Sequence, residues 1–271
     1  MNKVDLNGIP GLSGDSGGEI IIELADVTTG YARRTVTRHI DAVLRPGRLV
    51  SLLGPNGVGK STLLRTLGAF QPPLEGEVRV GGRRMEGMSP RELSRLIGVV
   101  LTERPEVERM SVREMAGMGR SPYTGFWGRL SADDEAIVDE ALRMTGIDAL
   151  ADRRTDRLSD GERQKVMIAK VLAQQTPVVL LDEPTAFLDF PSKVETMRLL
   201  GRLAHAMRKI VFLSTHDVEM ALQLSDELWL MTAEGIVTGT PSELAQQGAI
   251  GRFIQCEGVK FDAEALTLRV E

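Results

Sequence analysis

Short apolar runs recur along the chain and mark its predicted strands. We expect strands at residues 19–24, 49–53, 97–101, 178–181 and 210–213. The later runs do not alternate with polar residues, which is typical of strands covered on both faces in a parallel or mixed sheet. Helical patterns lie between or after the runs, at 61–69, 192–207 and 218–225. This succession of strands and helices predicts an α/β fold.

The stretch from about 107 to 157 has no such strand run and predicts a helical insertion. Helices are expected there at 111–118 and 131–145. Ser131 and Asp134 form a capping-box pattern ahead of the second helix. We expect this domain layout: a glycine-rich flexible tail at 1–18, a main domain at 19–245 with the insertion at about 105–160, and a C-terminal extension at 246–271.

Charge and cysteine content narrow the classes of function. The chain has 33 Lys and Arg against 38 Asp and Glu, a net charge of −5, and no basic block, so we expect no nucleic-acid partner. Cys256 is the single cysteine, which excludes an intrachain disulfide. The start of the sequence lacks a signal-peptide pattern, and no apolar run approaches the length of a membrane span. These features favour a protein of the reducing cytoplasm. We expect it to act at a membrane only through a partner.

A phosphate-binding loop follows the run at 49–53. The segment matches G-x-x-x-x-G-K-[ST] with the residues Gly54, Pro55, Asn56, Gly57, Val58, Gly59, Lys60 and Ser61. Glycines let backbone N–H groups face an anion, Lys60 adds a mobile charge for the β- and γ-phosphates, and Ser61 offers a hydroxyl to Mg²⁺. Thr62 adds a further hydroxyl for the phosphates. The alternative is a glycine-rich turn that caps an ordinary helix.

Two carboxylates follow the apolar run at 178–181. Asp182 is predicted to hold Mg²⁺, and Glu183 to orient and deprotonate the water that attacks the γ-phosphate. The alternative is an acidic strand end that enters a turn at Pro184. His216 follows the run at 210–213 and could bond the γ-phosphate, although a histidine after a strand is often structural. We assign no role to the remaining histidines, His39 and His205.

The order of these parts resembles the nucleotide-binding subunit of an ATP-binding cassette (ABC) transporter over residues 19–244. Residues 158–164, Leu-Ser-Asp-Gly-Glu-Arg-Gln, resemble the family signature L-S-G-G-Q and its basic residue, between the insertion and the acidic pair. Ser159 and Glu162 would also form a capping box for a helix at 164–173. The resemblance implies a P-loop NTPase core with a mostly parallel sheet and flanking helices, an antiparallel β part at the N-terminus and an inserted α-helical subdomain.

The resemblance also implies ATP hydrolysis with Mg²⁺ between two copies of the chain that face each other head to tail. Each signature helix would then present Ser159, Gly161 and Glu162 to the ATP held by the other copy's Lys60 loop. Tyr31 would stack on adenine, and Asp189 would lie in a loop that crosses to the other copy. An aromatic residue such as Tyr31, near a strand end, packs in a core just as often. Opening and closing of the dimer would drive a membrane permease.

The sequence departs from the family pattern in its signature and its Mg²⁺-sensing loop. Asp160 and Glu162 replace the usual Gly and Gln, which keeps the helix start but puts acidic groups near a bound triphosphate. After the run at 97–101 the family has a Gln that binds Mg²⁺ and senses the permease, and this chain has Thr102 and Glu103 instead. Glu103 is the expected metal ligand, with Thr102 as the alternative.

Residues 119–123, Gly-Arg-Ser-Pro-Tyr, resemble the importers of iron chelates, haem and cobalamin. This resemblance implies permease subunits, an indirect substrate-binding protein, and a place on the cytoplasmic face of a bacterial inner membrane. A soluble ABC-type ATPase switch that is not coupled to transport is the main alternative. A P-loop kinase is another, although it would have no use for a signature helix.

Overall fold

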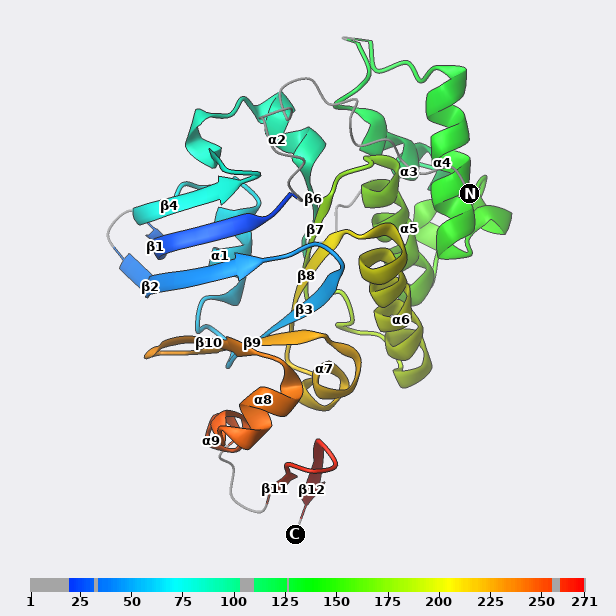
Figure 1. Ribbon diagram of the computed structural model, residues 1–271. Helices are drawn as coiled ribbons and strands as arrows, with labels where there is room; N and C mark the ends of the chain where they lie inside the picture. Colours follow the sequence, from blue (N-terminus) through cyan, green and yellow to red (C-terminus); the bar gives the residue numbers. More distant parts are fainter. Residues whose placement is uncertain (1–19, 32–33, 103–109, 126, 255–258, 271) are drawn as a thin grey trace.

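The computed structural model describes residues 20–31, 34–102, 110–125, 127–254 and 259–270. Its larger sheet has the strand order β10-β9-β3-β8-β7-β6 and runs through the middle of the molecule (Figure 1). These strands are β3 (Arg48–Leu53), β6 (Ile97–Val100), β7 (Val178–Asp182), β8 (Ile210–Thr215), β9 (Glu227–Thr232) and β10 (Gly235–Gly239). The apolar runs from 49–53 onward are therefore confirmed as strands.

Most of this sheet is parallel. Strands β9, β3, β8, β7 and β6 pair in parallel, and β10 adds an antiparallel edge. In this register Leu53 lies opposite Thr215, and Asp182 lies opposite Ser214. Because parallel strands in register end at the same edge, the segments that follow β3, β8 and β7 leave the sheet side by side.

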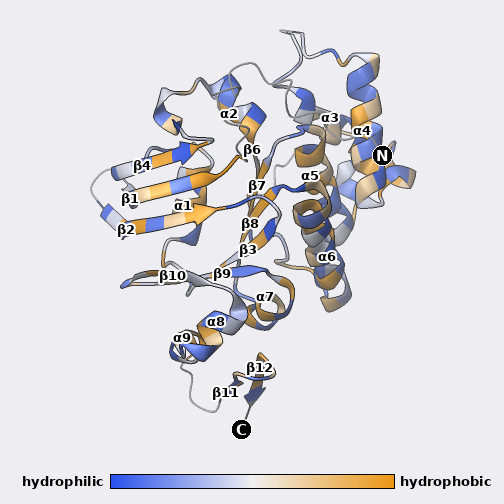
Figure 2. Ribbon diagram, viewed as in Figure 1, coloured by the Kyte–Doolittle hydropathy of each residue, from blue (hydrophilic) through white to orange (hydrophobic). Residues whose placement is uncertain are grey.

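Helices cover both faces of the sheet. α1 (Lys60–Leu67) lies on one face, and α5 (Asp160–Ala173) and α6 (Phe190–Met207) lie on the other (Figure 1). Along β7, Val178 and Leu180 pack in the hydrophobic cluster that contains α1, whereas Val179 and Leu181 pack in the cluster that contains α5 and α6. Apolar residues on both faces explain the lack of polar alternation, and the central strands are largely orange in Figure 2.

An antiparallel sheet packs over α1, as the resemblance implied. Its order is β2-β1-β4-β5, with β1 (Ile22–Tyr31), β2 (Arg34–Leu44), β4 (Glu75–Val80) and β5 (Arg83–Arg84). The first strand extends well beyond the predicted end at 24 because its pairing shifts between Leu24 and Val27, where Asp26 has φ 51°. A bulge breaks the hydrophobic pattern from which a strand is predicted. α2 (Pro90–Leu96) leads directly into β6 and was not predicted.

The predicted insertion is helical in the residues that the structure describes. It contains α3 (Val112–Gly117), the 3₁₀ helix η3 (Met118–Arg120) and α4 (Ala132–Thr145). Capping boxes start both α-helices, and the predicted box of Ser131 and Asp134 is one of them. α5 begins at Asp160, a turn earlier than the predicted start at 164, because Ser159 is its N-cap.

The C-terminal part contains α7 (Val218–Leu224), α8 (Pro241–Gln246), α9 (Ala249–Phe253), β11 (Val259–Asp262) and β12 (Thr267–Val270). Leu244 of α8 and Ile250 of α9 share a hydrophobic cluster with Leu53, on both sides of the boundary expected at 245/246. The division at that point stays a prediction. The tail at 1–18 lies outside the described residues. Among the described helices, none is long and apolar enough to cross a membrane.

Lys209 is a buried charge immediately before β8. It lies at the end of the sheet opposite to the predicted phosphate loop. Its side chain is 8% exposed, and its Nζ donates a hydrogen bond to the carbonyl oxygen of Thr176. Burial penalises the ammonium form and lowers the pKa of Lys209 to about 8 from 10.5. Between these two values the unfolded chain binds more protons than the folded chain.

We therefore expect Lys209 to make stability depend on pH. Relative to Lys209→Met, the free energy of unfolding of the wild type should increase as the pH rises from 8 to 10.5, by a total on the order of 3 kcal/mol. Urea unfolding of both proteins across this range measures the difference. The same substitution at Lys260, an exposed lysine, is the control. A constant difference between wild type and Lys209→Met would contradict the prediction.

Candidate functional site

The predicted phosphate loop, acidic pair and histidine meet at one edge of the sheet. The loop from Gly54 to Gly59 follows β3, Asp182 ends β7, and His216 follows β8. Because β8 lies between β3 and β7, His216 comes between the loop and the acidic pair. Thr102 follows β6, on the far side of β7. Groups that are far apart in the sequence thus face one another across neighbouring strand ends.

Glycines give the phosphate loop its shape at positions whose backbone conformation favours glycine. Gly57 and Gly59 have φ values of 79° and 121°, in the region that favours glycine. A Cβ at Gly59 would also lie 2.3 Å from a methyl carbon of Val36 on β2. Gly59 is the N-cap of α1, so the first turn of this helix begins where the loop ends. The loop and helix start are suited to binding an anion.

Lys60 is the first residue of α1 and is almost fully buried, with 6% of its surface exposed. Its Nζ donates hydrogen bonds to the carbonyl oxygens of Gly54, at 2.7 Å, and Pro55, at 3.2 Å. Burial lowers the pKa of Lys60, and the negative charges of Glu183 and Asp182 act in the opposite direction. The cation is therefore held inside its own loop and faces both carboxylates of the predicted site.

Asp182 is held at the end of β7 by neighbouring strands. Its side chain is buried, and its Oδ1 accepts a hydrogen bond from the Ser214 hydroxyl of β8 at 2.6 Å. Ser214 Oγ in turn accepts a bond from the backbone N–H of Glu183 at 2.9 Å. On the other side, the Thr102 hydroxyl donates to the carbonyl oxygen of Asp182 at 2.9 Å. One serine thus orients both acidic residues.

Glu183 turns sharply out of the strand. Its φ of 50° lies in the left-handed region, which is uncommon for a residue other than glycine, and its carbonyl accepts a bond from the Ala186 N–H. The turn directs the carboxylate toward β8, where its Oε2 lies 3.0 Å from Nε2 of His216. Backbone conformations of this kind often occur at functional sites. Glu183 and His216 therefore form a pair at the predicted point of attack.

Asp182 and Ser61 are the described residues that we predict to hold Mg²⁺, together with a nucleotide. Among the described residues there is no cluster of three or more His, Cys, Asp or Glu side chains that could hold a metal ion. Mg²⁺ commonly takes one or two protein oxygens and completes its shell with water and phosphate oxygens. The Asp182 carboxylate, oriented by Ser214, has the chemistry of such a ligand, and its role stays a prediction. Glu103, the other predicted ligand, lies outside the described residues.

The predicted signature residues form a separate group on α5 and α6. Ser159 accepts a hydrogen bond from the Glu162 N–H, and Glu162 Oε2 accepts bonds from the N–H and hydroxyl of Ser159 at 2.8 and 2.9 Å. These bonds are the main cause of the lowered pKa of Glu162. Gly161 lies against Ser192, whose N–H donates to Asp189, the N-cap of α6. The capping box is confirmed, and Asp189 lies beside the signature.

Tyr31 ends β1 near the first turn of α1. The Thr62 hydroxyl lies 3.5 Å from the Tyr31 hydroxyl, and 48% of the tyrosine is exposed. Tyr31 is thus not a core residue, so the alternative that it packs in the core is wrong. Its role in stacking on adenine stays a prediction.

Ser214 is the residue that sequence reasoning missed. The sequence at 210–215 does not show whether Ser214 orients an acidic pair or only lies at the end of a strand. Its role depends on β8 pairing with β7 in the register that places Ser214 opposite Asp182. Only a known strand order could have indicated it.

Comparison with known proteins agrees with this geometry. A family model described as ABC transporter matches residues 37–186, more than half of the chain. The chain belongs to the ABC transporter family. It is an ATPase with a P-loop fold, and both the phosphate loop and the acidic pair lie inside the matched region.

Its relatives among the ABC ATPases include importer subunits. The achromobactin transport ATP-binding protein CbrD of Dickeya dadantii is 37% identical over 83% of this chain and 84% of CbrD. The hemin import ATP-binding protein HmuV of Streptomyces coelicolor is 38% identical over 86% of this chain and 82% of HmuV. A solved dimeric structure of the bacterial ABC transporter cassette MJ0796 is 26% identical, with a TM-score of 0.71 over 81% of this chain and 98% of that one.

We expect Glu183→Gln to separate ATP binding from hydrolysis. The amide has nearly the shape of the carboxylate, but it cannot accept a proton from water, so hydrolysis should fall by about 100-fold or more. The dissociation constant for ATP should stay within about twofold of the wild-type value, because the variant keeps the contacts to the phosphates. Phosphate release and nucleotide titration measure the two quantities.

Lys60→Ala is the matched comparison for Glu183→Gln. It removes the buried cation that faces both carboxylates, so it should lose ATP binding as well as hydrolysis. Near-normal hydrolysis by either purified variant would contradict the roles predicted at this edge.

Proposed function

We propose that this chain hydrolyses ATP to power import of a metal chelate through a separate membrane permease. The chelate classes are an iron siderophore, haem or cobalamin. The names of CbrD and HmuV, together with the motif at 119–123, support this proposal. The subunit would lie on the cytoplasmic face of a bacterial inner membrane, held by the permease, with a substrate-binding protein acting on the other side.

The arrangement at the sheet edge is the observation that carries the chemical part of the proposal. Backbone N–H groups at the start of α1 and the Lys60 ammonium bind the phosphates, with Ser61 and Thr62 adding hydroxyls. Glu183 orients the attacking water and takes its proton. His216, 3.0 Å from Glu183, holds that carboxylate and directly follows β8, the strand between β7 and β3.

Mg²⁺ would neutralise charge that develops on the β- and γ-phosphate oxygens. Asp182 and Ser61 would hold it, and Glu103 or Thr102 would take the place of the family's Gln. Asp182 also keeps Glu183 in position, because both residues bond the same Ser214 hydroxyl.

A head-to-tail pair of subunits would complete the site. Lys60 begins a helix on one face of the sheet, whereas Ser159, Gly161 and Glu162 begin α5 on the other face. A helix N-terminus favours a negative charge, so α5 suits the γ-phosphate of ATP held by a second copy. Asp189, next to Ser192 and Gly161, would lie in the loop that crosses to that copy, and Tyr31 would stack on adenine. The MJ0796 cassette is dimeric in its solved structure, which supports the pairing of two copies.

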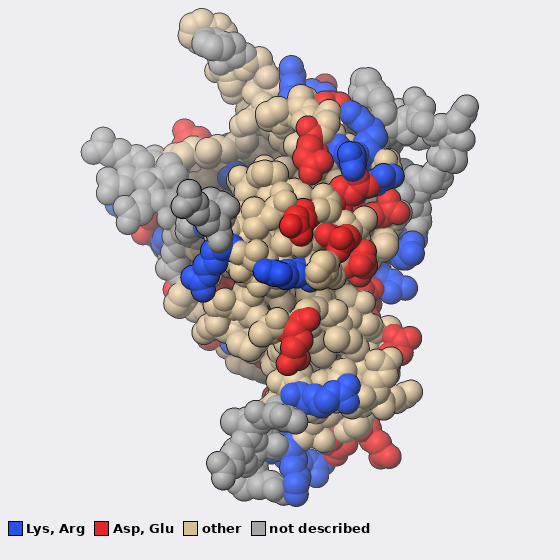
Figure 3. Space-filling view, turned by 90° about the vertical axis from the view of Figure 1, so that its left-hand side faces the viewer, with Lys and Arg blue, Asp and Glu red and all other residues tan. Residues whose placement is uncertain are grey.

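A soluble ABC-type switch that acts on nucleic acid has less support. On the face that Figure 3 shows, Lys and Arg side chains are interspersed with Asp and Glu side chains. Ion pairs also join Arg84 to Glu77 and Arg83 to Glu92, so these arginines are paired with acidic side chains. Nucleic-acid binding depends on a continuous basic surface, since phosphate contacts supply most of its affinity.

Purification from native membranes tests the coupling to transport. Tagged Glu183→Gln, with ATP present, should retain a polytopic permease, and disruption of that permease should stop uptake of one of the three chelates. Recovery of a soluble complex with no membrane protein would favour the switch. Recovery of a permease for an unrelated solute would leave the ATPase in place and contradict the substrate class.

Glu162→Gln tests the acidic signature. The glutamine oxygen can accept the same two bonds from Ser159, so the helix start and the thermal stability should be unchanged. Loss of one negative charge beside the bound triphosphate should strengthen ATP-driven dimerisation several-fold, roughly what 1 kcal/mol provides. Sedimentation of this variant in the Glu183→Gln background measures the dimer, and a weaker dimer would contradict the placement of Glu162 at ATP.

A further inference from the structure

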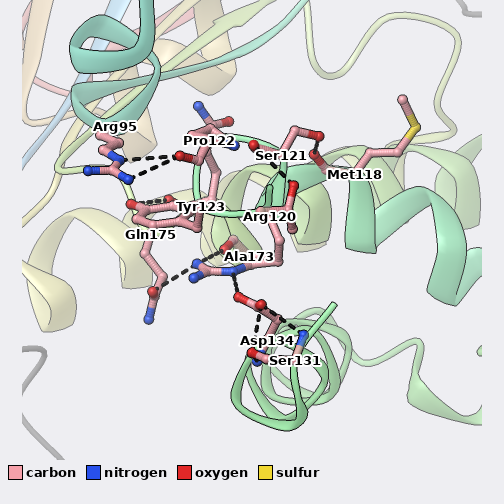
Figure 4. A network of polar contacts seen from close by, with 12 residues as sticks. Arg95, Met118, Arg120, Ser121, Pro122, Tyr123, Ser131, Asp134, Ala173 and Gln175 are labelled. Atoms are coloured by element: carbon pink, nitrogen blue, oxygen red, sulfur yellow. Dashed lines mark hydrogen bonds and ion pairs between the residues drawn. The ribbon is translucent and has the colours of Figure 1, made fainter. Parts of the chain in front are cut away.

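The Gly-Arg-Ser-Pro-Tyr motif at 119–123 has a structural role beyond marking a subfamily. It lies between α3 and α4, where the insertion meets both α2 of the core and the C-terminal end of α5 (Figure 4). Gly119 shows how closely these parts approach, because a Cβ there would lie 2.0 Å from the carbonyl oxygen of Lys170 on α5. The motif is thus packed directly on the backbone of the signature helix.

Arg120 binds the end of α5 to the start of α4. Its side chain is 6% exposed, and its Nε donates to Asp134 at 2.8 Å. Its Nη1 donates to the carbonyl oxygen of Ala173 at 2.8 Å and to the side chain of Gln175 at 2.9 Å. Carbonyl groups in the last turn of a helix have no partner within the helix, so Arg120 acts as a cap of α5.

Tyr123 lies between two guanidinium groups. The Arg120 guanidinium carbon is 4.0 Å from the centre of its ring, and that of Arg95 is 5.0 Å away. The Tyr123 hydroxyl donates to the carbonyl oxygen of Gln174 at 3.1 Å. Burial raises the pKa of Tyr123, against the two guanidinium groups that lower it. Cation–π contacts of this kind are stronger when they are shielded from water.

Arg95 belongs to the core, whereas Tyr123 and Arg120 belong to the insertion. Arg91 and Arg95 lie one turn apart on α2, and both donate to the carbonyl oxygen of Pro122. The side chain of Gln174 also bonds the carbonyl oxygens of Ser94 and Ile97. α2 continues into β6, which leads to Thr102 and its bond to Asp182. A continuous chain of contacts therefore joins the acidic pair to the end of α5.

We propose that Tyr123 is a positioning residue that sets the orientation of the signature helix against the core. We name Arg95, Tyr123 and Arg120 the arginine–tyrosine clamp. The clamp grips the C-terminal end of α5, and Ser159 lies at the other end of this 14-residue helix, about 20 Å away at about 1.5 Å per residue. A small rotation at the clamp therefore displaces Ser159 from the ATP of a second copy. The inference rests on the head-to-tail dimer of the proposed function.

Tyr123→Leu in the full chain tests this role. Leucine keeps an apolar side chain but removes the ring between the guanidinium groups and the bond to Gln174. In the Glu183→Gln background, the dissociation constant of the ATP-driven dimer should rise about tenfold, because a signature helix without the clamp spends less of its time in the orientation that dimerises. The affinity of the single subunit for ATP should stay within about twofold, because the Lys60 loop lies on the other face of the sheet.

Tyr123→Phe is the conservative variant and Arg143→Gln the matched control. Phenylalanine keeps the ring in the clamp and should restore most of the dimer affinity. Arg143 pairs with Glu140 within α4, so its loss removes a charge from the insertion without touching the core. This control should dimerise like the parent.

Sedimentation, ATP titration and thermal unfolding of each variant distinguish the outcomes. If Tyr123→Leu dimerises like the parent, the proposed role of the clamp is wrong, and the proposed head-to-tail dimer is not affected. The proposal is also wrong if Tyr123→Leu loses ATP affinity, stability and dimerisation equally and Tyr123→Phe shows the same losses. That result would indicate a structural role only. If the Glu183→Gln parent itself forms no dimer with ATP, the proposed head-to-tail pairing fails, and the clamp falls with it.

Discussion

The parallel pairing of β3, β8 and β7 is the constraint on which the candidate site depends. In this register the phosphate loop, His216 and the acidic pair leave the sheet at one edge. Because β8 runs between the other two strands, its Ser214 can bond both Asp182 and the backbone of Glu183. The left-handed turn at Glu183 then directs its carboxylate to His216. Hydrogen bonds between strands therefore determine the geometry of the side chains.

Burial determines how the charges at this edge behave. Lys60 loses water when it folds into its loop, and the carboxylates of Asp182, which ends β7, and Glu183, which follows it, act against this loss. Asp182 is buried and keeps a hydroxyl donor from Ser214. A buried charge without such partners would be costly. These contacts lower the free-energy cost of burying the charges. They also place a cation and two carboxylates where a triphosphate would react.

The two faces of the sheet divide the elements that are proposed to bind the nucleotide. α1 carries the phosphate loop on one face, whereas α5 carries the signature on the other, together with the insertion. This division is why a second copy is needed in the proposed mechanism. It also makes the junction between core and insertion important, since the contacts of α2 with the motif at 119–123 control how α5 is held.

The sequence by itself determined the fold class, the strands with uninterrupted apolar runs and the site residues that belong to local motifs. Glycines at 57 and 59, Lys60 and the capping box of Ser159 and Glu162 are local features, so spacing was enough to find them. Only the tertiary structure decided the course of β1 past its bulge at Asp26, the role of Ser214 and the pairing of Arg95 with Tyr123. These depend on strand order and on contacts between segments far apart in the chain, which no pattern of neighbouring residues records.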